Sequence, residues 1–170
     1  RLPILLLPGD TSSSRFPDPV LQQVEHFNSP SETQNDSFKS VSRYFDRITR
    51  PEQILTSLPQ AINVMLDPAD CGPAVISMSQ DVQGEAFDYP EIFFEEKIHQ
   101  IRRIHPDPNQ IQKAADKLKK SKQPIIISGG GVLYSEAEEE ISAFAKKHNI
   151  PVTATVMGIG CMNKDDPYYI

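Results

Sequence analysis

The sequence predicts an α/β protein in which parallel sheets are flanked by helices. The main observation is the order of elements from residue 107 to residue 156, where a helix, a buried strand, a second helix and a second buried strand alternate. Alternation of this kind implies a parallel sheet with helices on its faces. Two more apolar, strand-type runs, at 2–9 and 72–82, enclose a stretch with helical spacing at 50–68. The pattern therefore indicates two α/β pieces.

The first piece contains two segments that are harder to assign. Residues 10–38 are rich in Ser, Pro, Asp and Asn, so we expect an insertion, a functional loop or a mobile segment there. Residues 38–48 are strand-like at their centre. Within 50–68, Pro59 removes one helical hydrogen bond, and we expect a short helical turn, a break, and a second helix from Leu58 or Pro59.

A segment without clear periodicity, 85–108, separates the two pieces and is predicted to be a linker that packs on a surface. Its aromatic residues are expected to pin it to its own domain. They are Phe87, Tyr89, Phe93 and Phe94. Asp107 is a suitable cap for the helix that follows, with Pro108 at its first position. Buried strands are predicted at 124–128 and 151–156.

Composition excludes several classes of function. Among 170 residues, 23 are acidic and 17 basic, for a net charge of −6, so binding to nucleic acid is not expected. No window is long and apolar enough to span a membrane. Cys71 and Cys161 lie in unrelated contexts and suggest neither a disulfide framework nor a metal site. We therefore expect a cytoplasmic protein, and the uncovered strand at 2–9 suggests a fragment of a larger one.

Three glycines, Gly129–Gly131, follow the strand at 124–128 and raise the question of a phosphate site. The spacing is neither G-x-G-x-x-G nor that of a P-loop. Glutamates at 136 and 138–140 would repel a phosphate nearby. A tight turn is therefore the favoured interpretation, with Ser135 and Glu138 forming a capping box for the next helix.

Other candidate residues point weakly to chemistry. The four histidines share no metal-ligand spacing, and no serine lies in G-x-S-x-G. Asp81 follows a strand, where α/β sheets place ligands, but it could equally be a carboxylate that organises a loop. Arg43, Tyr44 and Asp46 form a polar and aromatic cluster for which surface packing is the favoured interpretation.

Longer stretches resemble a known family. RPEQILTSLPQAINVMLDPADCGPAVISMSQDVQGEAFDYP (50–90) resembles the end of the pyrimidine-binding domain of thiamine-diphosphate enzymes. PIIISGGGVLYSEAEEEISAFAKKHNIPVTATVMGIG (124–160) resembles the start of their middle domain. LLLPGD, SVSRYFDRI and QDVQGEAFDYP are similar to one branch, which acts in myo-inositol catabolism.

The resemblance implies a division of the chain. Residues 1–90 would be the C-terminal part of the pyrimidine-binding domain, 91–106 a linker, and 107–170 the start of a Rossmann-like middle domain. The implied activity is addition of the thiamine ylide to a cyclic polyol diketone, a small molecule, followed by hydrolysis of a ring C–C bond. The full-length enzyme would use thiamine diphosphate and Mg²⁺ and form a homo-oligomer, a dimer or a tetramer.

The resemblance also implies what this chain lacks and what it contributes. The family's activating glutamate and its Gly-Asp-Gly metal motif would lie outside the chain, so we expect no catalytic residue, no metal ligand and no bound cofactor in it. Arg43, Tyr44 and Phe45 stand where relatives approach the substrate channel. In flavin-bearing relatives such as acetolactate synthase, the residues that touch FAD correspond to Gly129, Gly130, Gly131, Met157 and Gly158.

For the branch suggested here FAD is not expected, and the predicted nucleotide-type turn would be empty. Two alternatives remain. One is a flavin-containing enzyme similar to acetolactate synthase. The other is a non-catalytic module that binds a nucleotide or acts as a scaffold.

Overall fold

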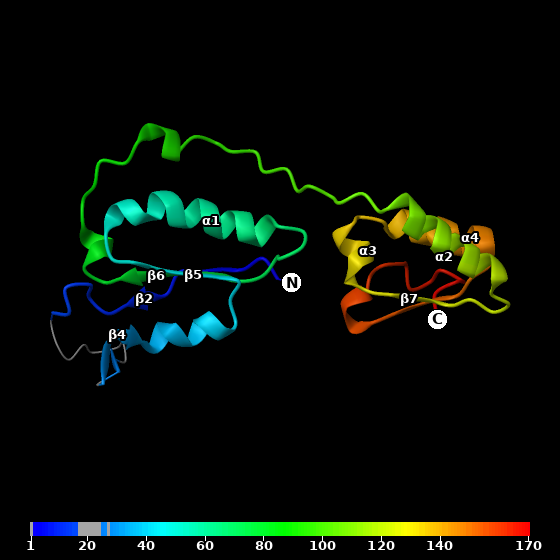
Figure 1. Cartoon of the computed structure of the whole chain (residues 1–170), viewed down its shortest axis with the longest axis horizontal. Helices are drawn as coiled ribbons and strands as arrows, with labels where there is room; N and C mark the ends of the chain where they lie inside the picture. The colour runs from blue at the N-terminus through cyan, green and yellow to red at the C-terminus, as the bar shows by residue number, and fades with distance from the viewer. Residues whose placement is uncertain (1, 17–24, 27) are drawn as a thin grey trace. The chain divides into compact units, whose positions relative to one another are not determined.

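The computed structural model describes residues 2–16, 25, 26 and 28–170. The chain divides into two compact units, Arg1–Arg102 and Arg103–Ile170, and each is described by itself. The division falls inside the segment 91–106 that the sequence analysis takes as a linker. Both units contain parallel strands and helices (Figure 1), so the predicted α/β class is confirmed.

The sheet of the first unit is built around one strand, β6 (Ala74–Ser79). β1 (Leu5–Leu6), β2 (Gly9–Asp10) and β5 (Tyr44–Ile48) all pair with it in parallel. The strand expected at 2–9 is thus two short strands along the same edge of β6. Pro8 lies between them, and since proline has no N–H it can only accept, from Met78 N at 2.8 Å.

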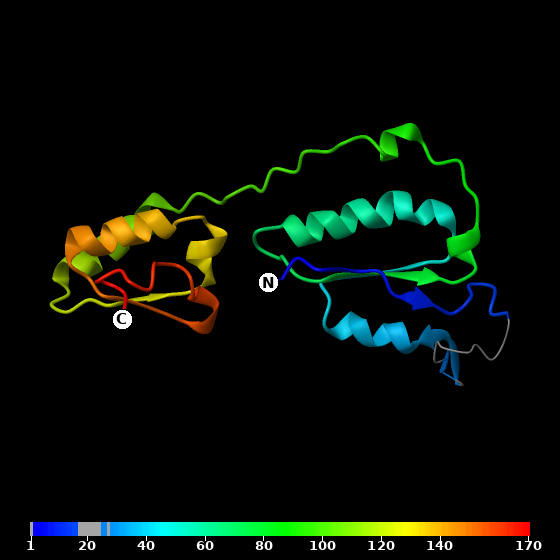
Figure 2. The same ribbon diagram turned by 180° about the vertical axis from the view of Figure 1, so that it is seen from behind.

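Both faces of this sheet are covered, which explains why β6 is buried along nearly its whole length. α1 (Ile54–Leu66) lies over one face and the 3₁₀ helix η1 (Gln34–Ser40) over the other, as Figure 2 shows from behind. The core beneath α1 is formed by buried residues from the strands, the helix and the following turn: Ile48, Ala61, Ala74, Ile76 and Val82.

The predicted break at Pro59 is wrong, because α1 runs continuously through it. A short 3₁₀ helix, η2 (Pro51–Gln53), precedes it. Proline removes a single backbone donor from the helix. Tertiary packing offsets that loss, since Ala61 is fully buried and Leu58 packs against the core.

The second half of 10–38, for which an insertion, a functional loop or a mobile segment was expected, contains regular structure. Residues 17–24 and 27 lie outside the described part of the chain. β4 (Ser29–Thr33) pairs antiparallel with β3 (Glu25–His26) and leads into η1. The regular structure of this segment could not be predicted from an apolar pattern, because polar contacts rather than an apolar face hold the segment in place.

Those contacts begin at Thr33, which caps η1 in a capping box with Asp36. Asn35 is buried and donates from Nδ2 to the Gly9 carbonyl at 2.7 Å and to Ser77 Oγ at 2.8 Å. A buried amide of this kind is satisfied only if its segment is fixed against the sheet. The segment is therefore tied to β2 and β6.

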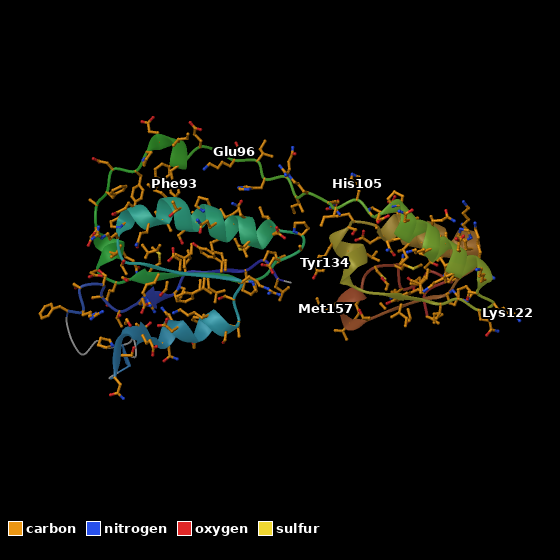
Figure 3. The ribbon with its side chains drawn as sticks, in the orientation of Figure 1. Phe93, Glu96, His105, Lys122, Tyr134 and Met157 are labelled. Carbon is orange, nitrogen blue, oxygen red and sulfur yellow. The ribbon has the colours of Figure 1, made fainter. Side chains whose placement is uncertain are left out.

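The segment after β6 contains two 3₁₀ helices, η3 (Val82–Gly84) and η4 (Glu91–Phe93), both within the first unit. Its aromatic rings contact one another: the centroids of Phe87 and Tyr89 are 5.0 Å apart, and those of Phe93 and Phe94 are 5.4 Å apart. Figure 3 labels Phe93 in this stretch. That these rings pin the linker to a domain stays a prediction.

The second unit follows the predicted α-β-α-β order with one addition. α2 (Pro108–Lys120), β7 (Ile126–Ser128), α4 (Glu138–His148) and β8 (Val152–Ala154) appear as expected, and β7 pairs in parallel with β8. A short helix, α3 (Gly130–Tyr134), is inserted after β7, and η5 (Val156–Gly158) follows β8. The core contains Ala145, Val152, Cys161 and Met162.

Capping was predicted correctly at one helix and wrongly at another. Asp107 caps α2 by accepting a hydrogen bond from Asn109 N at 2.7 Å. The capping box of Ser135 and Glu138 is wrong: Ser135 ends α3, and Ala137 precedes α4. The reason is that helical turns start at Gly130 and use Ser135 N–H as a donor to Gly131 O at 3.1 Å. In the described residues, no helix is both long and apolar enough to cross a membrane.

Candidate functional site

The carboxyl edge of the first unit's sheet is the candidate site. β2, β5 and β6 are parallel, so the residues that follow them gather at one edge, where α/β sheets place ligands. A cavity of about 180 Å³ opens there. It is lined by the loop after β2, by β4, and by the ends of β5 and β6.

Arg47 on β5 lines this cavity, and its guanidinium group is the centre of a network of ion pairs and hydrogen bonds. Its Nε donates to Asp10 Oδ2 at 2.7 Å, and one terminal nitrogen donates to Asp36 Oδ2 at 2.6 Å. The other terminal nitrogen donates to the Ser31 carbonyl at 3.2 Å. Asp10 is fully buried and also accepts from Ser77 Oγ and from Thr11 N. One guanidinium therefore joins β2, β4, β5 and η1.

The network holds its carboxylates in the charged form. Burial alone would raise the pKa of Asp10, but hydrogen bonds from Ser77 and Arg47 outweigh it and lower that pKa. Asp36 is likewise opposed by burial, yet Arg47 and Lys39 hold its pKa well below the usual range. Lys39 lies 2.6 Å from Asp36 Oδ1. Two carboxylates thus face two cations.

Of the two roles considered for Asp81, a ligand-binding residue or a carboxylate that organises a loop, its hydrogen bonds fit the second. It accepts hydrogen bonds from the backbone of Ser13 at 2.8 Å and of Ser14 at 3.0 Å, and from Ser13 Oγ at 3.0 Å. Burial opposes its charge, but the hydrogen bonds from Ser14 and Ser13 keep its pKa well below the usual range. Asp81 therefore fixes the loop that forms one wall of the cavity.

The predicted substrate-channel residues lie at the start of β5, with Arg43 just before the strand and Tyr44 and Phe45 within it, at the end opposite to this cavity. Arg43 is exposed and lies 3.5 Å from Asp70. Tyr44 shares a hydrogen bond of 3.1 Å with Ser57 on α1. The ring of Phe45 lies near Lys39 and Arg47, 5.1 Å and 5.8 Å from centroid to cation. Tyr44 packs against the core, whereas Arg43 is exposed, and the role of the three residues in a channel stays a prediction.

The structure brings together the two parts of the predicted nucleotide-type turn. Tyr134 and Met157 lie at the same end of the second unit (Figure 3). A methyl group on Gly130 would lie 3.0 Å from the Tyr134 ring and 3.1 Å from the Met157 carbonyl. A methyl group on Gly158 would overlap the Ser128 carbonyl and lie 3.1 Å from Gly129 Cα. The glycines thus permit two loops to touch.

Backbone geometry gives a different reason for Gly130 than positive φ. Among described glycines only Gly160 has positive φ, and Gly130 is the first residue of α3. Gly131, next to it, has open space where a methyl group would go. Glu136 does have a left-handed φ of 50° and lies 2.9 Å from Arg103. Close packing, not backbone strain, is the constraint at Gly130 and Gly158.

Described residues offer no cluster of three His, Cys, Asp or Glu side chains that could hold a metal. Asp10 is the last residue of β2 and belongs to the Gly-Asp pair of LLLPGD, but its carboxylate is already occupied by Arg47, Ser77 and Thr11 N. It does not fit the role of a Mg²⁺ ligand, which would leave Arg47 without its partner.

Sequence analysis missed the polar network that includes Arg47, a residue of the cavity lining, and fixes the elements around the cavity: Asp10, Asn35, Asp36 and Arg47. One signal was available for Asp10, a carboxylate directly after a buried strand. The others lie 25 to 37 positions further along the sequence, and nothing local links them to Asp10.

Comparison with known proteins shows a similarity to enzymes that depend on thiamine diphosphate. Residues 111–170 match the family model described as "Thiamine pyrophosphate enzyme, central domain". An X-ray structure of a protein from Mycobacterium smegmatis, described as thiamin diphosphate-dependent, aligns with 98% of this chain and 30% of its own, with a TM-score of 0.68. The two sequences are 20% identical, so this structure supports the fold alone. The predicted resemblance to thiamine-diphosphate-dependent enzymes is confirmed.

Curated relatives narrow the resemblance to one branch. A 3D-(3,5/4)-trihydroxycyclohexane-1,2-dione hydrolase of Bacillus velezensis is 51% identical over 97% of this chain, and one of Halalkalibacterium halodurans is 54% identical over 93%. The Bacillus subtilis protein of the same name is 49% identical over 97%. This chain spans about a quarter of their length, 25–26%.

Replacing Arg47 should destabilise the first unit far more than replacing Arg43. Arg47→Met leaves Asp10 buried without its cation, which should cost about 3–5 kcal/mol in the free energy of unfolding. Arg43→Met, the matched control, breaks an exposed pair with Asp70 and should cost less than about 1 kcal/mol. Urea unfolding measures both. Equal losses in the two variants would contradict the role given to the network.

Gly158→Ala should destabilise the second unit, whereas Gly131→Ala should not. The first methyl group meets the Ser128 carbonyl, and relieving that overlap requires a backbone shift that should cost about 1–3 kcal/mol. The second points into open space on a helix, where alanine is favoured over glycine by roughly 0.5–1 kcal/mol. Thermal melting of both variants distinguishes them, and a loss in Gly131→Ala as large as in Gly158→Ala would contradict the packing argument.

Proposed function

We propose that this chain is part of a thiamine-diphosphate-dependent enzyme that hydrolyses a ring C–C bond of a cyclic 1,2-diketone, trihydroxycyclohexane-dione, in myo-inositol degradation. The observation that carries this proposal is identity of about one half, over nearly the whole chain, with relatives bearing that name. Water supplies the hydroxyl group and the proton, one C–C bond breaks, and the ring opens to a chain.

In this proposal the chain supplies walls rather than the reaction centre. Residues 1–90 are the C-terminal part of the pyrimidine-binding domain, 91–106 the linker, and 107–170 the start of the middle domain. Thiamine diphosphate supplies the nucleophilic carbon that attacks the ketone. The described residues do not fit its metal, as the occupied carboxylate of Asp10 illustrates, so Mg²⁺ and the cofactor are held by other parts of the full-length protein.

We propose different roles in the substrate channel for Arg43, Tyr44 and Phe45. Arg43 is the member exposed enough to meet a substrate. Tyr44, bonded to Ser57, and Phe45, beside Lys39 and Arg47, would set the direction of the strand that carries it. A homo-oligomer, dimer or tetramer, and a cytoplasmic location complete the proposal.

We further propose that the turn at Gly129–Gly131 holds no nucleotide. The space beside Gly130 is filled by the Tyr134 ring and the Met157 carbonyl. A nucleotide phosphate would need that space in order to reach the backbone N–H groups of the turn. FAD is accordingly not expected, which separates the proposal from an enzyme similar to acetolactate synthase.

The full-length protein should hydrolyse the cyclic diketone when supplied with thiamine diphosphate and Mg²⁺, and it should show no flavin absorbance. Turnover is measured by the appearance of the open-chain acid, and bound flavin by visible absorption of the purified protein. Stoichiometric flavin with formation of acetolactate from pyruvate would replace the proposal with the flavin-containing alternative. Absence of any cofactor-dependent turnover would favour a scaffold or nucleotide-binding module.

This chain alone should not bind thiamine diphosphate, because the described residues offer neither a metal cluster nor a free carboxylate at the sheet edge. Titration calorimetry with the cofactor and Mg²⁺ tests this, with the full-length protein as the positive control. Saturable binding in the micromolar range by the chain alone would contradict the assignment of the cofactor site to other parts of the protein.

A further inference from the structure

We propose that the cavity at the carboxyl edge of the first unit's sheet binds an uncharged polyhydroxylated ring, and that it is the subsite for the ring hydroxyls of the substrate. The proposal rests on the proposed function for the identity of that ring. It differs from the substrate-channel prediction, since Arg43 lies at the opposite end of β5 from the cavity.

The first argument is the chemistry of the lining. Seven of the ten residues that line the cavity are serine or threonine. A hydroxyl both donates and accepts, so a wall of hydroxyls matches a ligand made of hydroxyls. A wall of this kind offers little to a flat apolar group.

The second argument is that some of these hydroxyls lack partners within the described residues. Ser12 and Ser79 are 6% and 1% exposed, and both line the cavity. Neither their hydroxyls nor that of Thr11 takes part in a hydrogen bond within the described part of the chain. Neither Ser12 Oγ nor Ser79 Oγ is among the fully enclosed polar atoms of the described residues that lack a partner. These hydroxyls are therefore open to the cavity, and a ligand there can form hydrogen bonds with them without displacing a protein partner.

The third argument is charge, which distinguishes a polyol from a phosphate. The carboxylates of Asp10 and Asp36 balance the cations of Arg47 and Lys39. Arg47 already donates to Asp10, Asp36 and the Ser31 carbonyl. An anion would have to compete with these buried carboxylates for the guanidinium. A neutral ligand meets no such competition. Arg15, the other cation of the lining, is exposed to solvent and stands outside this buried network.

Size gives the fourth argument. The cavity of about 180 Å³ is smaller than the roughly 300–1,000 Å³ of pockets for drug-sized ligands. It suits a single six-membered ring, and its wall is held by Asp81 through the backbone of Ser13 and Ser14.

The test uses the full-length protein and two substitutions that each remove one unpartnered hydroxyl, Thr11→Val and Ser79→Ala. Thr56→Val, on an exposed turn of α1, is the matched control. One readout is the dissociation constant of myo-inositol, a neutral cyclic polyol, by calorimetry. The other is KM and kcat for the cyclic diketone.

Each of the two variants should weaken inositol binding and raise KM roughly three- to tenfold, as expected for one lost hydrogen bond. The value of kcat should stay within about twofold, and the control should change neither quantity. Because inositol binding requires no turnover, it decides this proposal even if the full-length protein does not hydrolyse the diketone.

Three results would overturn the proposal: wild-type protein that does not bind myo-inositol, inositol binding that both folded variants retain in full, or inorganic phosphate binding more tightly than inositol and weakened in the same variants. Melting curves establish that each variant is folded. Using two substitutions from different strands' ends keeps the test decisive if one of them prevents folding.

Discussion

The ion pair between Arg47 and the buried carboxylate of Asp10 is the interaction on which the first unit's architecture depends. A buried charge is costly unless it is paired and hydrogen-bonded. Asp10 meets that condition only where Arg47, Ser77 and the backbone of Thr11 converge on it. Its pairing therefore fixes β2, β5 and β6 relative to one another at the edge where the cavity opens.

The same guanidinium reaches beyond the sheet and orders polar sequence. Through Asp36 and the Ser31 carbonyl it holds β4 and η1, segments with almost no apolar residues to bury. Asn35 adds bonds to β2 and β6 from the same side. Specific polar contacts here replace the hydrophobic face by which helices usually dock, and they leave a cavity lined mainly by hydroxyl groups.

Periodic apolar patterns allowed much of the fold to be predicted from the sequence. The run at 72–82 identified β6, and the alternation after residue 107 identified the second unit. Local rules failed where tertiary contacts outweigh them. α1 continues through Pro59 because its apolar face is anchored, and Ser135 ends a helix because helical turns begin at Gly130. The cavity could not be predicted, because its charged floor joins residues that are distant in sequence, such as Asp10 and Arg47.

The central position of β6 imposes an order on folding. Each of the other three strands of its sheet is hydrogen-bonded to β6, yet β6 comes last in the chain, with Leu5 opposite Ala74. During synthesis, β1, β2 and β5 must wait until about seventy further residues have followed Leu5. Pairing over such a separation is slow to form. A nascent chain of this length therefore exposes several unpaired strand edges at once, and such edges are prone to pair with other chains until β6 is made.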